Sequence, residues 1–342
     1  MKDWWIYQGP GTVEEQNTRL AEQQPPWRTY AGTPDPAYTP PGLDSEAGKA
    51  THRRGTGYVP DTEEKDAVNT ALYLRRPLLV TGKPGVGKST LAYSIAVELE
   101  LGPVLHWPIT SRTTLRDGLY QYDAIGRLHD ANLHNLQTHS AQPVDPSIAP
   151  YLRLGPLGTA LLPQPRPRVL LIDEIDKSDI DLPGDLLTVF EEGSFEIPEL
   201  ARLAAHQPEV HIGTEDDPQT RARVNEGNVQ CRSFPIVILT SNGEREFPPP
   251  FLRRCIRLHM QPPRKDKLTQ IVRQRLGLDP AAAERHQDLI EAFIERQLEG
   301  DLATDQLLNA VQLRMKGAWS DTEDRKQFLE TVMQRLTGHT SV

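Results

Sequence analysis

The stretch "GKPGVGKST" (residues 82–90) constrains the fold of this chain more than any other. It follows a short apolar run, "PLLVTG", and opens a segment, "KSTLAYSIAVELEL", that predicts a helix. Its three glycines let the backbone curl until several N–H groups face one point, and the helix N-terminus adds partial positive charge there. The stretch therefore predicts a strand, loop and helix that bind a phosphate chain. Lys88 would reach the β- and γ-phosphates, and Ser89 would offer a hydroxyl to Mg²⁺.

A second apolar run delivers acidic residues at its end. The segment "RVLLIDEID" (residues 168–176) has no polar residue inside its run, as expected of a strand buried on both faces. Asp173 is placed to hold Mg²⁺ through water and Glu174 to polarise an attacking water; capping of a following helix is the alternative. The next pair, Asp176 and Lys177, is interpreted as an exposed pair or a subunit contact.

A third apolar run, "FPIVILTSN" (residues 234–242), ends in a polar triplet. Asn242 can hydrogen-bond the terminal phosphate and the water, although an Asn before Gly is also ordinary turn chemistry. A short helix and the run "CIRLHM" follow. This order predicts an α/β fold with a doubly wound, mostly parallel sheet, whose active site lies at the carboxyl ends of the strands.

The length of 342 residues predicts one large domain and a smaller unit. Residues 61–261 carry the α/β pattern and begin with a helix whose capping box pairs Asp61 with Glu64. Residues 262–342 show helical periodicity throughout, which predicts a small all-α lid domain packed over the nucleotide. The acidic stretch "GTEDDPQ" (residues 213–219) is interpreted as a solvated loop.

Residues 1–60 are rich in Pro, Gly, Gln and Thr and lack periodicity, which predicts an extended arm. One interpretation is a disordered leader. The other is that Trp4, Trp5 and the stretch "PPWRTY" dock on a neighbouring surface, since exposed tryptophans are unfavourable in water. Whether such a surface belongs to the next subunit or to another protein stays open.

Composition excludes several classes of function. The net charge of −9 argues against a generic nucleic-acid coat. No apolar run approaches the ~20 residues that span a bilayer, and the opening "MKDWWIYQGPG" lacks the apolar core of a signal peptide, so a cytoplasmic location is expected. Cys231 and Cys255 have no metal-type spacing and are expected to be buried, reduced thiols.

Taken in order, "GKPGVGKST", "VLLIDEID", "LTSN" and "PPPFLRRCIRL" resemble an AAA+ ATPase. The stretches "ITSRTTLRDGLYQYDAIGRL" and "DLPGDLLTVFEEGSFEIPEL" resemble the MoxR branch, and are similar to MoxR-like ATPases encoded beside von Willebrand factor A partners in bacterial conflict systems. The resemblance covers roughly residues 55–340. It implies ATP and Mg²⁺ as cofactors, and a homo-oligomeric ring that is expected to be a hexamer.

The resemblance also implies site residues. Glu174 and Asn242 are implied as catalytic, with Arg254 as an arginine finger and Arg253 as the reserve. Ser89 and Asp173 are implied at the metal. The nucleotide-binding residues that it implies are Tyr58, Val59, Gly82, Pro84, Gly85, Val86, Gly87, Lys88, Ser89, Thr90 and Gln306.

The lid departs from the family at one position. Relatives carry a sensor 2 arginine near the start of the third lid helix, where this chain has Gln306. Three explanations remain open: the lid senses nucleotide without a cation, Arg314 substitutes, or a neighbouring subunit supplies the charge.

The arginine pair follows three prolines in "FPPPFLRRCIRL" (residues 247–258). A cation that stabilises the γ-phosphoryl transition state can come from another subunit, and such a finger contributes ~10³ to 10⁵ in rate, or ~4 to 7 kcal/mol of barrier. The prolines then form a rigid turn that fixes the start of a short helix, so that the side chain of Arg254 projects from the subunit surface in a set direction. The alternative is a basic pair that contacts surface acids.

The long segment 110–167 is where the resemblance implies an inserted hairpin that faces the pore, with "GPLG" (residues 155–158) as its turn. Tyr120, Tyr122 and Leu157 either touch a substrate there or belong to the core. The expected function is ATP hydrolysis that remodels or activates a partner protein in bacterial defence or stress, with a von Willebrand factor A protein as the candidate partner. The alternatives are an ATP-gated scaffold with negligible turnover and a McrB-like nucleic-acid motor; nucleic acid and membrane partners are not expected.

Overall fold

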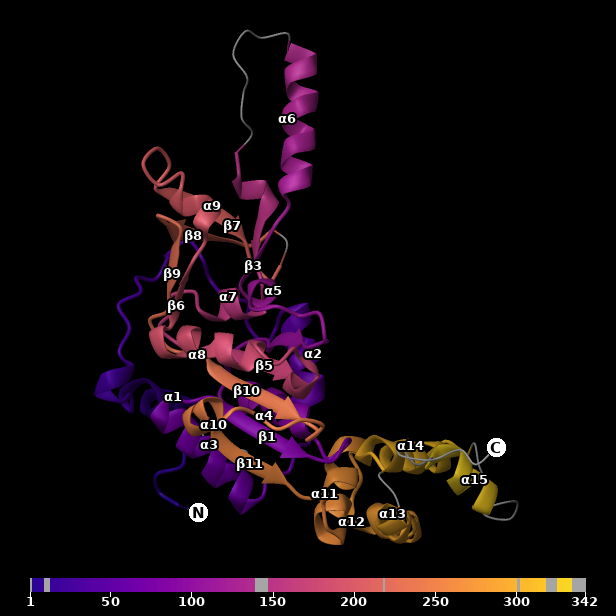
Figure 1. Cartoon of the computed structure of the whole chain (residues 1–342). Coiled ribbons are helices and arrows are strands. Elements are labelled where there is room, and N and C mark those ends of the chain that lie inside the picture. Colours follow the sequence, from indigo (N-terminus) through magenta and orange to yellow (C-terminus); the bar gives the residue numbers. More distant parts are fainter. Residues whose placement is uncertain are drawn as a thin grey trace.

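The computed structural model describes residues 2–8, 13–138, 147–217, 219–299, 302–317 and 325–333. Within these residues, an α/β domain carries a second sheet on one side and a helical unit on another (Figure 1). None of the described helices combines the length and the apolar composition that crossing a membrane requires.

The α/β domain is built on a five-stranded sheet with the order β11-β1-β10-β5-β2. Every neighbouring pair in it is parallel. The strands are β1 (Leu78–Gly82), β2 (Leu105–Pro108), β5 (Val169–Asp173), β10 (Ile236–Ser241) and β11 (Ile256–Met260). The three apolar runs of the sequence are β1, β5 and β10, and they lie side by side at the centre of the sheet, so their polar ends meet at one edge. The predicted doubly wound α/β fold is confirmed.

Alternate residues of these strands enter two separate cores. Leu170 and Ile172 of β5 pack on one face of the sheet, whereas Val169 and Leu171 pack on the other. Helices α7 (Pro156–Ala160), α8 (Leu182–Glu192) and α10 (Pro249–Arg254) cover the first face, and α3 (Thr62–Leu74) and α4 (Lys88–Glu98) cover the second. Burial on both faces explains why the three central strands, β1, β5 and β10, carry no polar residue until they end.

A second, six-stranded sheet has the order β3-β4-β7-β8-β9-β6. Its strands are β3 (Tyr120–Tyr122), β4 (Leu152–Leu154), β6 (Ser194–Glu196), β7 (Glu209–Gly213), β8 (Arg221–Asn225) and β9 (Asn228–Gln230), accompanied by α5 (Leu115–Leu119), α9 (Pro198–Ala201) and the 3-10 helix η2 (Ala149–Tyr151). A further 3-10 helix, η3 (Ile175–Lys177), follows β5 of the first sheet. Strands β3 and β4 pair antiparallel, and α6 (Ala124–Thr138) extends from β3 away from the body of the domain (Figure 1).

One expectation about this segment is wrong, and one open question about it is settled. The stretch "GPLG" is not a turn: Gly155 caps helix α7, and Pro156 is its first residue, where a missing N–H costs nothing. Leu157 is fully buried, and Tyr120 is buried with its hydroxyl donating to Glu199. The core interpretation of these two residues therefore holds.

The stretch interpreted as a solvated loop also differs from expectation. The side chain of Asp216 is 1% exposed and lies 2.6 Å from the guanidinium of Arg168. The hydroxyl of Tyr38 donates to the same carboxylate over 2.6 Å. The N-terminal segment, the residue that precedes β5 and the β7–β8 connection are thus joined through the buried carboxylate of Asp216.

The N-terminal segment packs along its own α/β domain. It contains α1 (Val13–Glu22), η1 (Pro26–Arg28) and α2 (Glu46–Gly55), so it has more regular structure than an extended arm. Ile6 and Tyr7 are buried, and their N–H groups donate to the side chain of Asn69. Trp5 is buried too, but Trp27 is 76% exposed.

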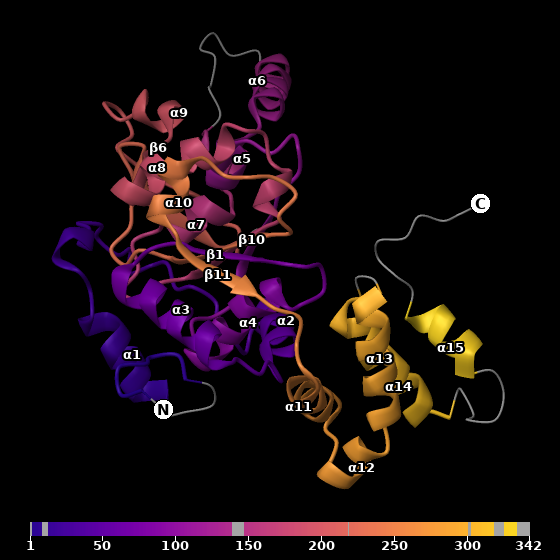
Figure 2. The same cartoon turned by 60° about the horizontal axis from the view of Figure 1, so that its bottom comes forward.

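The C-terminal unit is helical and has its own core. Its helices are α11 (Lys265–Leu276), α12 (Pro280–Glu284), α13 (Gln287–Glu299), α14 (Thr304–Met315) and α15 (Arg325–Val332). Leu268, Phe293 and Val311 are fully buried within this unit. Figure 2 shows it beside the sheet domain, joined to it through the end of β11.

Candidate functional site

The loop between β1 and α4 adopts a backbone that glycine permits. Gly85 and Gly87 have φ values of 76° and 99°, in the left-handed region. A Cβ on Gly85 would lie 2.3 Å from the Cα of Ala303, so this glycine also lets the helical unit approach the loop. The N–H of Thr304 donates to the carbonyl of Gly85 over 3.1 Å. The loop is thereby held between the sheet and the helical unit.

Lys88 begins α4 and its side chain turns back over this loop. Its amine donates to the carbonyls of Gly82 and Lys83 over 2.7 and 2.9 Å. It also donates to the Oδ1 of Asn242 over 2.8 Å. Burial lowers the pKa of Lys88, while the nearby carboxylate of Asp176 opposes this shift. The amine is therefore a desolvated cation at the edge where β1 and β10 end.

Asp173 ends β5 and accepts hydrogen bonds on both oxygens. Ser89 and Thr240 donate to Oδ1 over 2.7 and 2.6 Å, and His106 lies 3.2 Å from Oδ2. Burial alone would raise the pKa of Asp173, but the hydrogen bonds from His106, Thr240 and Ser89 outweigh it and lower the pKa to about 2. A carboxylate beside a serine hydroxyl is the kind of oxygen donor set that Mg²⁺ accepts.

Glu174 follows directly and has a φ of 60°, which is uncommon for a residue other than glycine. Its N–H donates to the hydroxyl of Thr240 over 2.9 Å. Its carboxylate lies 2.6 Å from the amine of Lys177, in a pair that is about four-tenths exposed. The left-handed backbone at Glu174 ends the strand abruptly, and Glu174 lines the cavity described below.

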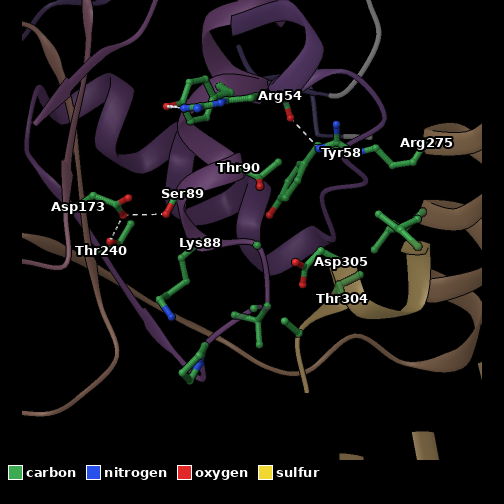
Figure 3. Close-up of a pocket in the computed structure, with 18 of the residues that line it drawn as sticks. Arg54, Tyr58, Lys88, Ser89, Thr90, Asp173, Thr240, Arg275, Thr304 and Asp305 are labelled. Carbon is green, nitrogen blue, oxygen red and sulfur yellow. Dashed lines mark hydrogen bonds between the residues drawn. The ribbon is translucent and has the colours of Figure 1, made fainter. Parts of the chain in front are cut away.

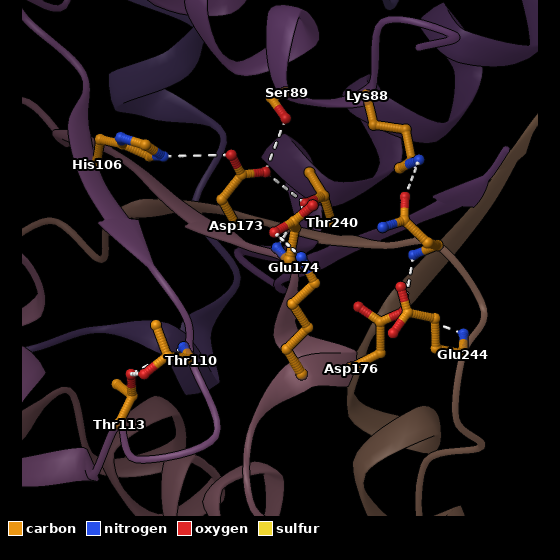
Figure 4. A network of polar contacts seen from close by, with 12 residues as sticks. Lys88, Ser89, His106, Thr110, Thr113, Asp173, Glu174, Asp176, Thr240 and Glu244 are labelled. Carbon is orange, nitrogen blue, oxygen red and sulfur yellow. Dashed lines mark hydrogen bonds and ion pairs between the residues drawn. The ribbon is translucent and has the colours of Figure 1, made fainter. Parts of the chain in front are cut away.

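Asp176 corrects an expectation, since it is neither exposed nor paired with Lys177. It is buried, and its Oδ2 accepts the N–H groups of Asn242 and Glu244 over 2.8 and 3.1 Å (Figure 4). The turn after β10 is thus fixed by a carboxylate that follows β5. Through this contact, Asp176 sets the position of Asn242 opposite Lys88.

The end of β5, the start of α4 and the turn after β10 line a cavity of about 740 Å³, a volume typical of small-molecule sites (Figure 3). Tyr58 lies against the phosphate-binding loop, with its ring 3.6 Å from where a Cβ of Gly87 would be. Arg53 and Arg54 of α2 contribute to the same wall. Figure 3 shows Tyr58 between Arg275 of the helical unit and Thr90 of α4.

Two cations of the cavity come from α11 and were not found from the sequence. Lys267 lies 2.6 Å from Glu64 and 3.2 Å from Asp61 of α3. Arg275 donates to the carbonyls of Arg53 and Arg54 over 2.9 and 2.6 Å. In sequence both look like the polar side of an amphipathic helix, so no local signal separates them from surface residues.

The helical unit therefore supplies cations through α11. Arg314 does not substitute at the cavity, because it forms a two-pronged contact with Asp288 of α13, over 2.6 and 2.8 Å. The side chain of Gln306 accepts from the N–H of Ala303 at the start of α14.

The structure brings most of the predicted residues together. Those that line the cavity are Tyr58, Pro84, Gly85, Val86, Gly87, Lys88, Ser89, Thr90, Asp173, Glu174 and Asn242. Gly82 lies beneath it as an acceptor for Lys88. Val59 and Gln306 are not among the described residues that line it.

Arg253 and Arg254 lie near the amino ends of the strands, opposite the carboxyl ends where the cavity lies. They end α10, and β11 begins two residues after Arg254. The first residue of β11 pairs with Leu78, and its last pairs with Gly82, at the start of the phosphate-binding loop. A strand of this length spans roughly 13 Å at about 3.3 Å per residue. Arg254 is therefore too far from the loop of its own chain for its side chain to reach it.

The fold and the cavity together define a P-loop nucleoside triphosphatase. Residues 77–255 match the family model of the AAA domain (dynein-related subfamily), and because the match covers more than half of the chain, the protein belongs to this family of AAA+ ATPases. ATP binding and ATP-driven activity follow from that membership. No curated protein matches the chain.

Proposed function

We propose that this protein hydrolyses ATP with Mg²⁺ as a ring of identical subunits, in which each active site is completed by Arg254 of a neighbour. The observation that carries the proposal is the separation of its parts. The carboxyl ends of the strands bring together Lys88, Asp173, Glu174 and Asn242. Arg254 lies instead near the amino ends of the strands.

The residues of one chain have distinct roles in this proposal. Lys88 and the loop N–H groups bind the β- and γ-phosphates, and Asn242 shares the terminal phosphate with Lys88. Ser89 and Asp173 hold Mg²⁺, which supplies positive charge to the phosphate oxygens. Glu174, which lines the same cavity, orients and polarises the attacking water.

Arg254 of the next subunit supplies the missing cation at the γ-phosphate. A finger of this kind contributes ~10³ to 10⁵ in rate, so an isolated chain would be a poor ATPase. Arg253 is exposed at the same helix end and remains the alternative. In the proposed organisation, residues 1–60 form an N-terminal segment, 61–261 the nucleotide-binding domain and 262–342 a lid that contributes Lys267 and Arg275.

The work performed is proposed to be remodelling or activation of a partner protein. The resemblance of the sequence to MoxR-like ATPases supports this assignment. The proposed setting is bacterial defence or stress, and the candidate partner is a von Willebrand factor A protein. Helix α6 supports a protein partner physically, because it projects from the domain (Figure 1). The side chains of Ile125, Leu128 and Leu133 on this helix are exposed. Exposed apolar side chains on a projecting helix suit a protein contact.

An ATP-gated scaffold with negligible turnover is the second candidate. The contact between Glu174 and Lys177 favours it, because a carboxylate that pairs with an ammonium is less available to water. In a scaffold, ATP would still bind through Lys88 and Ser89.

Specific activity measured against protein concentration separates these functions. A finger that acts in trans predicts turnover per subunit that rises as the ring assembles. Arg254→Ala should remove most of this activity while fluorescent ATP analogues still bind, and Lys88→Ala should abolish binding. A specific activity of the wild-type protein that stays near zero at all protein concentrations would favour the scaffold.

A further inference from the structure

Glu191, near the end of α8, holds the side chain of Arg254. Its Oε1 accepts a hydrogen bond from the Nε of Arg254 over 2.7 Å. Its Oε2 lies 3.6 Å from the Nη2 of Arg28, which belongs to the N-terminal 3-10 helix η1. One carboxylate therefore bridges two guanidinium groups from distant parts of the chain.

Arg28 is the fixed side of this bridge. Its side chain is only 8% exposed. It donates from Nη1 to the carbonyl of Phe190 over 2.5 Å and to the hydroxyl of Tyr30 over 3.1 Å, and its guanidinium lies 5.6 Å from the ring centre of Phe234. A buried cation with these contacts gives Glu191 a rigid partner, because few rotamers satisfy all of them.

Glu191 contacts the Nε of Arg254, on the side of the guanidinium group and not at its two terminal nitrogens. Of the terminal nitrogens, Nη1 has only a 3.4 Å contact with the carbonyl of Pro250. Terminal nitrogens are the ones with which arginine grips a phosphate in a forked contact. Glu191 therefore restricts the direction of Arg254 without covering the atoms that would touch phosphate.

We propose that Glu191 is a positioning residue for the arginine finger and that Arg28 fixes Glu191 in place. This inference rests on the proposed role of Arg254 in trans. Arg28 lies outside the segment 77–255 that matches the family model. Under this proposal, the N-terminal segment therefore takes part in setting up the neighbour's active site. An arginine side chain loses rotamer entropy when it binds a phosphate, and a preset direction reduces that loss at the transition state.

The test compares Glu191→Gln with Glu192→Gln, its exposed neighbour on α8, which undergoes the same charge change. Loss of the charge-assisted contact should lower kcat about 3- to 10-fold. The KM for ATP and the ring assembly measured by sedimentation should not change, because Glu191 does not line the subunit's own cavity. Glu192→Gln should match the wild-type protein in all three measurements.

A double variant shows whether Glu191 acts through Arg254. If it does, Glu191→Gln combined with Arg254→Ala should be as slow as Arg254→Ala alone. A further fall in the double variant, or wild-type or faster turnover of Glu191→Gln, overturns the positioning role. Wild-type turnover of Arg254→Ala would instead contradict the finger itself, so failure of the inference is distinguishable from failure of the proposed function. Arg28→Lys, which keeps the charge but not the fork, should lower kcat in the same direction.

Discussion

The amine of Lys88 lies 2.8 Å from the Oδ1 of Asn242, across the gap between the ends of β1 and β10. The side chain that is expected to bind phosphate and the one expected to sense it are thus in direct contact. Asn242 is held there from behind, because its N–H donates to Asp176.

The first prediction concerns Asp176. Asp176→Ala leaves the N–H groups of Asn242 and Glu244 without their acceptor, and a buried donor without a partner costs about 1 to 3 kcal/mol. We expect turnover to fall about tenfold, because Asn242 loses its position, with a smaller change in ATP affinity. Steady-state hydrolysis and titration with a fluorescent ATP analogue measure the two effects.

Asp176→Asn is the matched control for that experiment, since its amide oxygen can still accept both N–H groups. It should retain more turnover than Asp176→Ala. Equal turnover of the two variants would mean that the negative charge near Lys88, and not the hydrogen bonds, is what matters.

The second prediction concerns Lys177. The contact between Lys177 and Glu174 is partly exposed, so its loss should cost little stability, about 0.2 to 1 kcal/mol. If the same interaction restrains Glu174, then Lys177→Ala should raise turnover by about 1.5- to 5-fold. Lys177→Arg keeps a cation for Glu174 and should stay close to the wild-type rate. Slower hydrolysis by Lys177→Ala would show that the contact orients Glu174 productively instead.

The phosphate-binding loop could be predicted from sequence because its chemistry is local. Residues 82–90 carry the glycines, the lysine and the serine in one continuous stretch. The capping box of α3 is local for the same reason, and the structure shows both of its hydrogen bonds, between Asp61 and Glu64. Positions that depend on neighbours in the chain are readable without a fold.

Asp176 and Arg275 could not be placed in this way. Asp176 is buried because the end of β10 lies beside the end of β5, which is a property of strand order and not of the stretch "DEIDK". Arg275 reaches the cavity because α11 packs beside α2, more than 200 positions earlier in the chain. Both contacts are set by tertiary structure.

Asp216 illustrates the same limit and gives the third prediction. Asp216→Ala removes one partner from a buried ion pair with Arg168, which should destabilise the fold by about 3 to 5 kcal/mol. Tyr38→Phe removes only one hydrogen bond to this carboxylate and should cost about 1 kcal/mol. Unfolding in urea measures both changes.

Asp217→Ala controls for the loss of an acid in the same loop. Asp217 is exposed, so its substitution should change the free energy of unfolding by less than about 0.5 kcal/mol. Similar losses for Asp216→Ala and Asp217→Ala would contradict a special role for the buried pair.

The fourth prediction concerns the two cysteines, which are free and buried. Burial raises the pKa of Cys231 and of Cys255 to about 12. At pH 8 roughly one thiol in 10⁴ is then ionised in the folded chain, compared with about a quarter in an unfolded one. A disulfide reagent should therefore react slowly with the folded protein. On denaturation it should react with two thiols per chain.

The same shift predicts how stability depends on pH. A thiol whose pKa is raised in the folded state contributes stability that is present below the unfolded pKa of about 8.5 and is lost as the pH rises toward 12. The free energy of unfolding should therefore fall above pH 8.5, and less steeply in Cys231→Ser and Cys255→Ser. On denaturation, each single variant should show one reactive thiol per chain instead of two. Rapid reaction of either thiol at pH 8 in the folded protein would contradict its burial.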